Sequence, residues 1–336
     1  MRGVAILLVL FGHGFQNYKV GPAAAAGVTL FFVLSGYLIT GILLDRPSLR
    51  TFYARRLTRL APPLFVMVLV VLIVGGISWT HAIGALTWTQ NYTEYHIDTW
   101  PFGVTWSLGV EEQFYLLWPL FLLAVPRRHL SRSLVILFAA LMAWRMWRAF
   151  GGDLIQSYTS VECAGTAMVA GAYVRARSVQ LSAGAGSMGI YVLVCLIGAT
   201  CAIGSVAWLA LPIFATVPCA MLVASHESLS RWLARPWLVW CGITSYSMYL
   251  WHDTLPSLFD AETLPWGVAV GALVGVVAYY AVERPVMRWR SRSHRVEVRV
   301  RPGVGELGGV VRGPRHIDST GLKDVRSAGP VPVKAE

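Results

Sequence analysis

Two glutamates lie side by side in a stretch of the chain that is otherwise almost entirely apolar. The stretch reads TWSLGVEEQFYLLWPLFLLAV from Thr105 to Val125, and Glu111 and Glu112 follow its start by a little more than one helical turn. Glu111 could simply stabilise the positive end of the helix dipole. A carboxylate at membrane depth is nevertheless costly unless it is paired or hydrated, so both residues are candidates for proton transfer or ligand contact.

A histidine and an arginine share one face of the first apolar segment. Arg2, Ile6, Val9 and His13 follow the i, i+4, i+7, i+11 spacing of a single helical face. At 1.5 Å per residue, His13 lies about 16 Å from Arg2 along the axis, and Glu111 lies about 7 Å inside the outer boundary of its own segment. We therefore expect His13 and Glu111 at similar depth. A lone intramembrane histidine could also serve only as a hydrogen-bond donor between helices.

Further polar residues lie on two other apolar segments. The ninth segment reads WLVWCGITSYSMYLWHDTLP and carries Tyr249 and His252 toward the depth predicted for His13. His252 lies near the end of this segment, so it could equally extend to the membrane interface. Ser35 in FFVLSGYLITG could bind a substrate, or could simply allow two helices to approach closely. None of these residues decides the function alone.

A layer of basic residues is predicted at the inner ends of the segments. It contains Arg2, the arginines of FYARRLTRLAPP and the pair Glu283–Arg284. Arg56 and Arg59 could hold an anionic ligand, because guanidinium groups form bidentate hydrogen bonds with phosphate. Inner loops are rich in arginine in any case, so these residues could equally serve only to fix topology. The pattern suggests one layer for catalysis and one for anion binding.

The composition excludes a soluble domain. Of 336 residues, 56% are hydrophobic and 13% charged, and the mean hydropathy is +0.57, so we predict an all-α polytopic integral membrane protein. The five cysteines are scattered through apolar stretches without the CxxC spacing of a metal site. We expect them to be small buried residues and expect no bound metal.

Apolar runs of membrane-spanning length predict about ten transmembrane helices in one bundle. The expected spans are roughly 2–18, 27–44, 61–79, 106–125, 133–150, 159–174, 183–203, 206–224, 237–256 and 264–283. With the N-terminus in the cytoplasm, each inner loop is rich in arginine, and the positive-inside rule then places both termini in the cytoplasm. The net charge of +11 therefore needs no nucleic-acid partner.

The chain divides into two parts by composition. We predict a transmembrane domain over 1–284 and a basic, disordered cytoplasmic tail over 285–336, where Arg, Gly, Pro and Ser predominate. The connection from Thr80 to Thr105 is the longest between predicted spans, and its aromatic and polar residues suit an interfacial lid.

Six motifs taken in order resemble the membrane acyltransferase-3 family, whose bacterial members acylate hydroxyls of sugars in surface polysaccharides, lipids or exported metabolites. The motifs are RGVAILLVLFGH, VTLFFVLSGYLITG, FYARRLTRLAPP, TWSLGVEEQFYLLWP, SYSMYLWH and VERPVMRW, and together they extend over roughly residues 2–290. Arg2 and His13 match the family's Arg-x10-His motif. Arg56 and Arg59 match its Arg-x-x-Arg motif, and the third match is Trp-Ser-Leu-x-x-Glu at Trp106, Ser107 and Glu111.

The resemblance implies a membrane-embedded O-acyltransferase with acyl-CoA, most simply acetyl-CoA, as donor substrate and no tightly bound cofactor. His13 would be the general base and Glu111 would orient its imidazole. Arg2, Arg56 and Arg59 would bind the donor. The residues expected to contact or support the substrate are Trp106, Ser107, Glu112, Ser35, Tyr249 and His252.

The acceptor implied by the resemblance is a carbohydrate or glycoconjugate at the bacterial plasma membrane, as in polysaccharide O-acetylation. Acylation of a cytoplasmic metabolite, such as an antibiotic sugar, would keep the same chemistry with another acceptor. A different class is also open, because intramembrane His, Glu and Arg are equally the components of a proton-coupled transporter of an organic anion. The sequence leaves the oligomeric state open.

Overall fold

The computed structural model describes residues 1–15, 20–45, 48–75, 79–92, 101–203, 209–259 and 264–290. Met1–Arg292 form one unit, to which all described residues belong. The predicted tail lies outside the described residues from position 291 onward, whereas positions 285–290 continue the last helix.

The described residues form helices and connecting turns and contain no strand, so the all-α prediction is confirmed. The helices are α1 (Arg2–Gly14), α2 (Pro22–Leu44), α3 (Leu49–Gly75), α4 (Trp79–Leu86), α5 (Thr105–Ala124), α6 (Leu130–Phe150), α7 (Leu154–Thr159), α8 (Val161–Ala176), α9 (Ala183–Ile203), α10 (Leu211–Ala224), α11 (Ser230–Leu233), α12 (Pro236–Ser257) and α13 (Pro265–Ala278). A 3₁₀ turn covers Gln90–Tyr92, and a π-helical turn at Tyr279–Glu283 extends α13.

Five of the described helices are long and apolar enough to cross a membrane. They are α2, α3, α6, α9 and the continuous helix Pro265–Arg290 that contains α13. Two shorter helices, α1 and α10, are also apolar. The chain is thus a membrane protein, while the count of ten spans stays a prediction.

Helix α3 begins earlier than predicted. The expected span started at residue 61, but the helix begins at Leu49 and includes the arginine-rich segment. Pro62 and Pro63 lie inside it without ending it. Membrane helices tolerate proline where the surrounding protein compensates for the lost backbone hydrogen bonds. Close to the prolines, the hydroxyl of Tyr246 of α12 donates to the Leu60 carbonyl at 2.7 Å. The arginines therefore project from a continuous helix.

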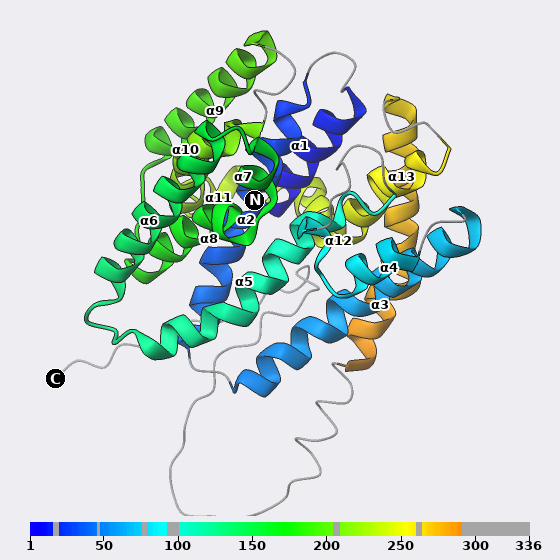
Figure 1. The fold of residues 1–336 in the computed structure, drawn as a ribbon, viewed down its shortest axis with the longest axis horizontal. Helices are drawn as coiled ribbons and strands as arrows, with labels where there is room; N and C mark the ends of the chain where they lie inside the picture. The colour runs from blue at the N-terminus through cyan, green and yellow to red at the C-terminus, as the bar shows by residue number, and fades with distance from the viewer. Residues whose placement is uncertain are drawn as a thin grey trace, which may run out of the picture. The chain divides into compact units, whose positions relative to one another are not determined.

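The helices lie on both sides of α5 in the view of Figure 1. Helices α6, α8, α9 and α10 lie to its left, and α3, α4, α12 and α13 lie to its right. Helix α2 packs against α1, α8 and α10, and α12 packs against α1 and α13. Helices α1 and α2 therefore connect the two groups.

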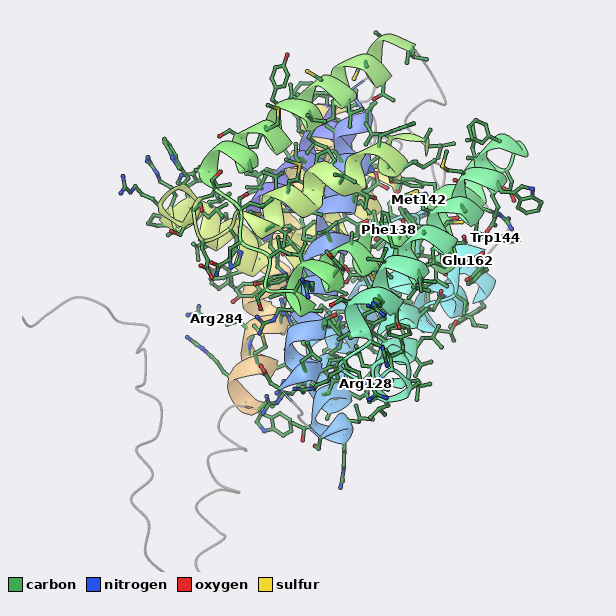
Figure 2. The ribbon with its side chains drawn as sticks, turned by 90° about the vertical axis from the view of Figure 1, so that its left-hand side faces the viewer. Arg128, Phe138, Met142, Trp144, Glu162 and Arg284 are labelled. Atoms are coloured by element: carbon green, nitrogen blue, oxygen red, sulfur yellow. The ribbon has the colours of Figure 1, made fainter. Side chains whose placement is uncertain are left out.

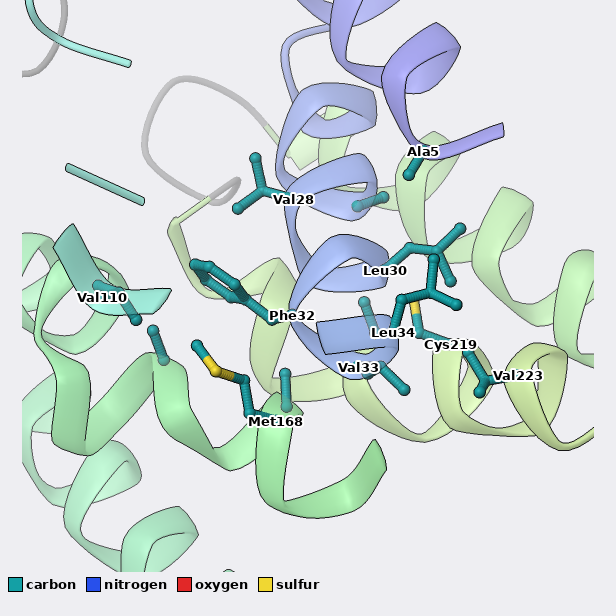
Figure 3. Close-up of a cluster of buried hydrophobic side chains, with 14 of the residues drawn as sticks. Ala5, Val28, Leu30, Phe32, Val33, Leu34, Val110, Met168, Cys219 and Val223 are labelled. Carbon is teal, nitrogen blue, oxygen red and sulfur yellow. The ribbon is translucent and has the colours of Figure 1, made fainter. Parts of the chain in front are cut away.

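The main hydrophobic core lies around α2. Figure 3 shows Leu30, Val33 and Leu34 of α2 beside Met168 of α8 and Cys219 of α10, all of them buried. A second cluster joins α3, α4 and α12 through residues such as Leu64, Met67, Ala82, Leu250 and Trp251. Between these two clusters lies the pocket described below.

Close backbone contacts fix the positions of α2 and α8. A Cβ added at Gly36 would overlap the Met168 carbonyl, and one added at Gly171 would overlap the Val33 carbonyl. Small residues at membrane helix interfaces allow such close approach. Gly36 therefore allows two helices to approach closely, whereas Ser35 is hydrogen-bonded to Glu111.

Candidate active site

A pocket of about 640 Å³ lies between α1, α2, α3, α5 and α12. Its apolar wall comes mainly from α2, through Val28, Phe31, Phe32, Leu38, Ile39 and Ile42. Its polar lining consists of Arg2, Ser35, Thr51, Arg55, Arg56, Arg59, Ser107, Glu111, Tyr115, Ser245, Tyr246, Tyr249 and Arg290. Five guanidinium groups and one carboxylate thus face the same space.

Two of the five arginines have carboxylate partners outside the pocket lining. Arg56 donates from Nη2 to Glu112 Oε1 at 2.9 Å, and its guanidinium lies 3.4 Å from the centroid of the Tyr115 ring. Arg59 Nε lies 3.4 Å from Glu283 Oε1. These two arginines are therefore positioned and neutralised by the protein itself.

The π-helical turn at the end of α13 places the partner of Arg59. Glu283 is buried within this turn, and its Oε2 accepts a hydrogen bond from Ser247 Oγ of α12 at 2.7 Å. Single π-helical turns are rare and occur often at functional sites. The turn here brings the carboxylate into the space between α3 and α12.

The other three arginines lack such neutralisation. Arg290 donates from Nη1 to the Arg55 carbonyl at 3.2 Å and to Thr58 Oγ1 at 3.4 Å. Within the described ranges, none of Arg2, Arg55 and Arg290 forms an ion pair with a carboxylate. The part of the pocket lined by Arg2, Arg55 and Arg290 is therefore strongly positively charged.

Glu111 lies on the wall of the pocket and is hydrogen-bonded to a serine of α2. Its Oε1 accepts a hydrogen bond from Ser35 Oγ at 2.7 Å. Farther along the wall, Ser107 Oγ and the Tyr249 hydroxyl lie 2.7 Å apart, with either atom able to donate. Three of the predicted supporting residues thus line the pocket together with Glu111.

His13 pairs with His252 rather than with Glu111. His13 Nδ1 lies 3.3 Å from His252 Nε2, and the ring centroids are 4.8 Å apart at an interplanar angle of 75°. The centroid of the His252 ring lies 5.3 Å from that of the Tyr249 ring, which faces the pocket. His252 is fully buried, whereas His13 is partly exposed. The two histidines therefore lie just beyond the pocket, behind Tyr249.

The structure brings most residues of the predicted catalytic and anion-binding layers together around one pocket, with two differences from the prediction. Arg2, Arg56, Arg59, Ser35, Ser107, Glu111 and Tyr249 line one pocket, and Glu112 supports it through Arg56. Trp106 instead packs in the core, with its ring centroid 6.0 Å from that of Phe32 and 4.7 Å from that of Tyr158. The expected contact between His13 and Glu111 is replaced by separate contacts to His252 and Ser35. The catalytic roles themselves stay predictions.

Sequence reasoning missed several residues of the pocket. Arg55 belongs to the predicted basic layer but was not among the residues expected to bind the donor, and Arg290 was placed in the tail, yet both line the pocket. Tyr115 and Tyr246 also line it and were not predicted. An i, i+4 comparison would have placed Arg55 and Arg59 on one face of a single helix, but only if the segment before Pro62 had been predicted as helical.

The predicted lid is partly helical and attached to α5. Residues 93–100 lie outside the described ranges, while α4 packs against α3 and α5. Gln113 Nε2 of α5 donates to the Trp88 carbonyl at 2.7 Å and to Asn91 Oδ1 at 2.9 Å. These bonds hold the start of the connection against the helix that carries Glu111.

A family model described as an acyltransferase domain matches residues 1–282 of the 336. The chain belongs to this acyltransferase family. The predicted resemblance and the prediction of an enzyme are both confirmed, so the transporter alternative is set aside.

Curated relatives carry more specific names. The chain is 25% identical to a peptidoglycan O-acetyltransferase of Listeria monocytogenes, over 86% of this chain and 55% of that protein. It is 28% identical to a putative peptidoglycan O-acetyltransferase of Bacillus subtilis, over 88% of this chain and 56% of that protein. It is also 29% identical to nodulation protein 10 of Rhizobium leguminosarum, over 45% of this chain and 50% of that protein. The chain spans about half the length of these relatives. No solved structure matches it.

Proposed function

We propose that this acyltransferase moves an acetyl group from acetyl-CoA to a hydroxyl group of a carbohydrate acceptor at the membrane. The observation that carries the proposal is the pocket itself. Its lining combines five arginines with an apolar wall and ends at Ser107 and Tyr249, beside the pair formed by His13 and His252. Phosphate binding, acyl-arm binding and proton transfer would thus occur along one path.

The charge distribution favours a donor with several negative charges. Glu112 and Glu283 neutralise Arg56 and Arg59, but Arg2, Arg55 and Arg290 retain their charge without an ion pair among the described residues. Arginine forms bidentate hydrogen bonds with phosphate oxygens, and CoA carries several phosphates. We therefore assign the phosphates chiefly to Arg55 and Arg290 at this end of the pocket, with Arg2 alongside.

The size and the wall of the pocket suit the rest of the donor. Ligand pockets measure about 300–1,000 Å³ and are mostly apolar with a few polar groups, and this pocket measures about 640 Å³. Its apolar α2 wall could hold the pantetheine arm in extended form. The thioester would then reach the part of the wall formed by Ser107 and Tyr249.

The proposed reaction requires a base and no metal. The acceptor oxygen attacks the thioester carbonyl carbon, the new C–O bond forms and the C–S bond breaks, and the electron pair leaves with the thiolate. His13 takes the hydroxyl proton and returns it to the thiolate. A thiolate leaves readily because the parent thiol has a pKa near 8.5. The partial exposure of His13 leaves a side open to the acceptor.

The names of the relatives favour acetyl as the acyl group and peptidoglycan as the acceptor class. The two relatives that match 86% and 88% of this chain are both named for peptidoglycan O-acetylation. Peptidoglycan lies outside the cytoplasmic membrane, whereas CoA is made inside, so donor and acceptor would enter from opposite faces. Arg2 lines the pocket from the start of α1, and His13 lies near the end of the same helix. Most of the length of α1 therefore separates the arginine end of the pocket from His13, which suits entry from opposite faces.

The same arrangement orients the chain in the plasma membrane with the arginine end in the cytoplasm. Figure 2 shows Arg128 just before α6 and Arg284 near the last helix, both below Trp144 at the far end of α6. Arginine-rich ends face the cytoplasm in membrane proteins. Both termini would then be cytoplasmic.

The test is transfer by the purified protein in lipid nanodiscs. The protein receives acetyl-CoA and a set of soluble peptidoglycan fragments and other oligosaccharides, and thiol release and acceptor mass are followed together. The proposal predicts thiol release matched by a mass increase of one acetyl group, and hydroxylamine should remove the added group because it is an ester. Thiol release without any acetylated acceptor, or an acetylated amine instead of a hydroxyl, would contradict it.

A further inference from the structure

Three hydrogen-bond distances define the environment of the two histidines. His252 Nδ1 lies 2.7 Å from the carbonyl oxygen of Tyr249, and His252 Nε2 lies 3.3 Å from His13 Nδ1. The same His13 Nδ1 lies 3.0 Å from the carbonyl oxygen of Val9. Within the described ranges, neither ring is hydrogen-bonded to a carboxylate.

These distances fix where the protons lie. A carbonyl oxygen can only accept, so His252 Nδ1 must carry hydrogen, and in the neutral ring His252 Nε2 then has a lone pair. That lone pair can accept only from a protonated His13 Nδ1, which agrees with the Val9 carbonyl on the same nitrogen. His13 Nε2 is consequently the nitrogen without hydrogen. It is the atom able to take a proton from a hydroxyl group.

We propose that His252 is a positioning residue that, together with the Val9 carbonyl, holds His13 as the Nδ1–H tautomer and so exposes Nε2 as the base. The proposal rests on the function proposed above and assigns to His252 the orienting role that the sequence suggested for Glu111. When His13 takes the hydroxyl proton on Nε2, its Nδ1–H still donates to His252, so the ring keeps its orientation until the proton passes to the thiolate.

A neutral partner suits this place in the protein. His252 is fully buried, and a carboxylate there would carry the cost of a buried charge throughout the catalytic cycle. A histidine supplies the acceptor atom without that cost while it is neutral. It stabilises an imidazolium less than a carboxylate would, so its main contribution is the choice of tautomer.

The backbone around His252 restrains its position. Helix α13 approaches α12 so closely that a Cβ added at Gly271 would lie 2.5 Å from the Trp251 carbonyl oxygen and 2.8 Å from that of His252. On the other side, a Cβ added at Gly12 would overlap the backbone of Ala24. Both histidines therefore project from helices that cannot shift without a clash.

The test reads the tautomer directly by NMR of ¹⁵N-histidine-labelled protein in nanodiscs. Protonated and unprotonated imidazole nitrogens have well-separated shifts, and a His13→Gln sample identifies the His13 signals among those of the eight histidines. The inference predicts hydrogen on Nδ1 and none on Nε2 of His13. Hydrogen on His13 Nε2 in the unaltered protein would overturn it without any variant.

Variants of His252 then test whether this residue determines the tautomer of His13. His252→Leu should give a mixture of His13 tautomers and lower kcat on the order of 10- to 100-fold, with KM for acetyl-CoA unchanged because His252 does not line the pocket. His252→Gln retains an acceptor oxygen and should restore both the tautomer and most of the rate. Thr254→Val is the matched control, since Thr254 is equally buried on the same helix and its hydroxyl has no hydrogen-bond partner among the described residues.

The outcomes separate this inference from the proposed function. An unchanged His13 tautomer in His252→Leu, or an equal loss of rate in His252→Leu and His252→Gln with the tautomer kept, would overturn the positioning role. If His252→Leu does not fold, the comparison of His252→Gln with the unaltered protein still shows whether an amide acceptor preserves the tautomer. Absence of acetyl transfer by every sample would refute the proposed function, while the NMR result would stand independently.

Discussion

Removal of the Arg55 guanidinium should weaken donor binding without destabilising the protein. Arg55 is exposed, lines the pocket and forms no ion pair with a described carboxylate, so its loss leaves no buried charge behind. A hydrogen bond to a charged group contributes about 1.5–3 kcal/mol, and solvent screening at an exposed site reduces this to about 1 kcal/mol. Arg55→Ala should therefore raise the Kd for CoA about fivefold.

Arg290, which contacts Arg55, gives a second test of the same phosphate assignment. Arg290 is half-buried and donates to the Arg55 carbonyl, and both residues line the pocket. Arg290→Ala should raise the Kd for CoA about tenfold, and the double variant should raise it less than the product of the two effects because the two cations share one ligand. The effect should shrink at high salt as the phosphates are screened.

The assay is calorimetric titration of CoA into protein in nanodiscs, with dephospho-CoA as a second ligand. Arg50→Ala is the control, since Arg50 is an exposed arginine on the same helix and does not line the pocket. Unaltered CoA affinity in Arg55→Ala would refute the assignment of phosphate binding to the end of the pocket lined by Arg55 and Arg290. An equal loss in both variants would reduce the effect to general surface charge.

Two predictions concern stability. Gly36→Ala should lower the free energy of unfolding by about 1–3 kcal/mol, because the added Cβ would overlap the Met168 carbonyl. Gly198→Ala is the control: nothing lies within 4 Å of its added Cβ, so the melting temperature should not fall. Glu112→Gln should cost on the order of 3 kcal/mol, because both side chains of its ion pair with Arg56 are less than a fifth exposed. An unchanged melting temperature for Glu112→Gln would show that the pair does not hold α3 against α5.

The helices were largely predictable because their cause is local. Runs of apolar residues of membrane length predict helix wherever they occur, as in α2, α6 and α9. The start of α3 was missed because its first residues are polar and basic, and because Pro62 and Pro63 suggest a break. The helix nevertheless continues through both prolines.

The contacts between the site residues were not predictable from the sequence. The rise per residue predicts that His13, Glu111 and His252 lie at similar depth. Which of them meet depends on the rotation and crossing of α1, α5 and α12, and these follow from close contacts such as that at Gly12. Arg55 and Arg290 are separated by 235 positions along the chain and meet only through the path of the last helix.

The central claim is that His13 acts as the base of an acetyl transfer, and the most direct test is the rate of acetyl-ester formation by His13→Ala. The protein in nanodiscs receives saturating acetyl-CoA and the best carbohydrate acceptor, and thiol release and ester formation are measured together. If His13 is the base, the rate should be lower by roughly 10²–10⁴-fold, with CoA affinity unchanged because His13 does not line the donor pocket. Full turnover by a folded His13→Ala protein would contradict it.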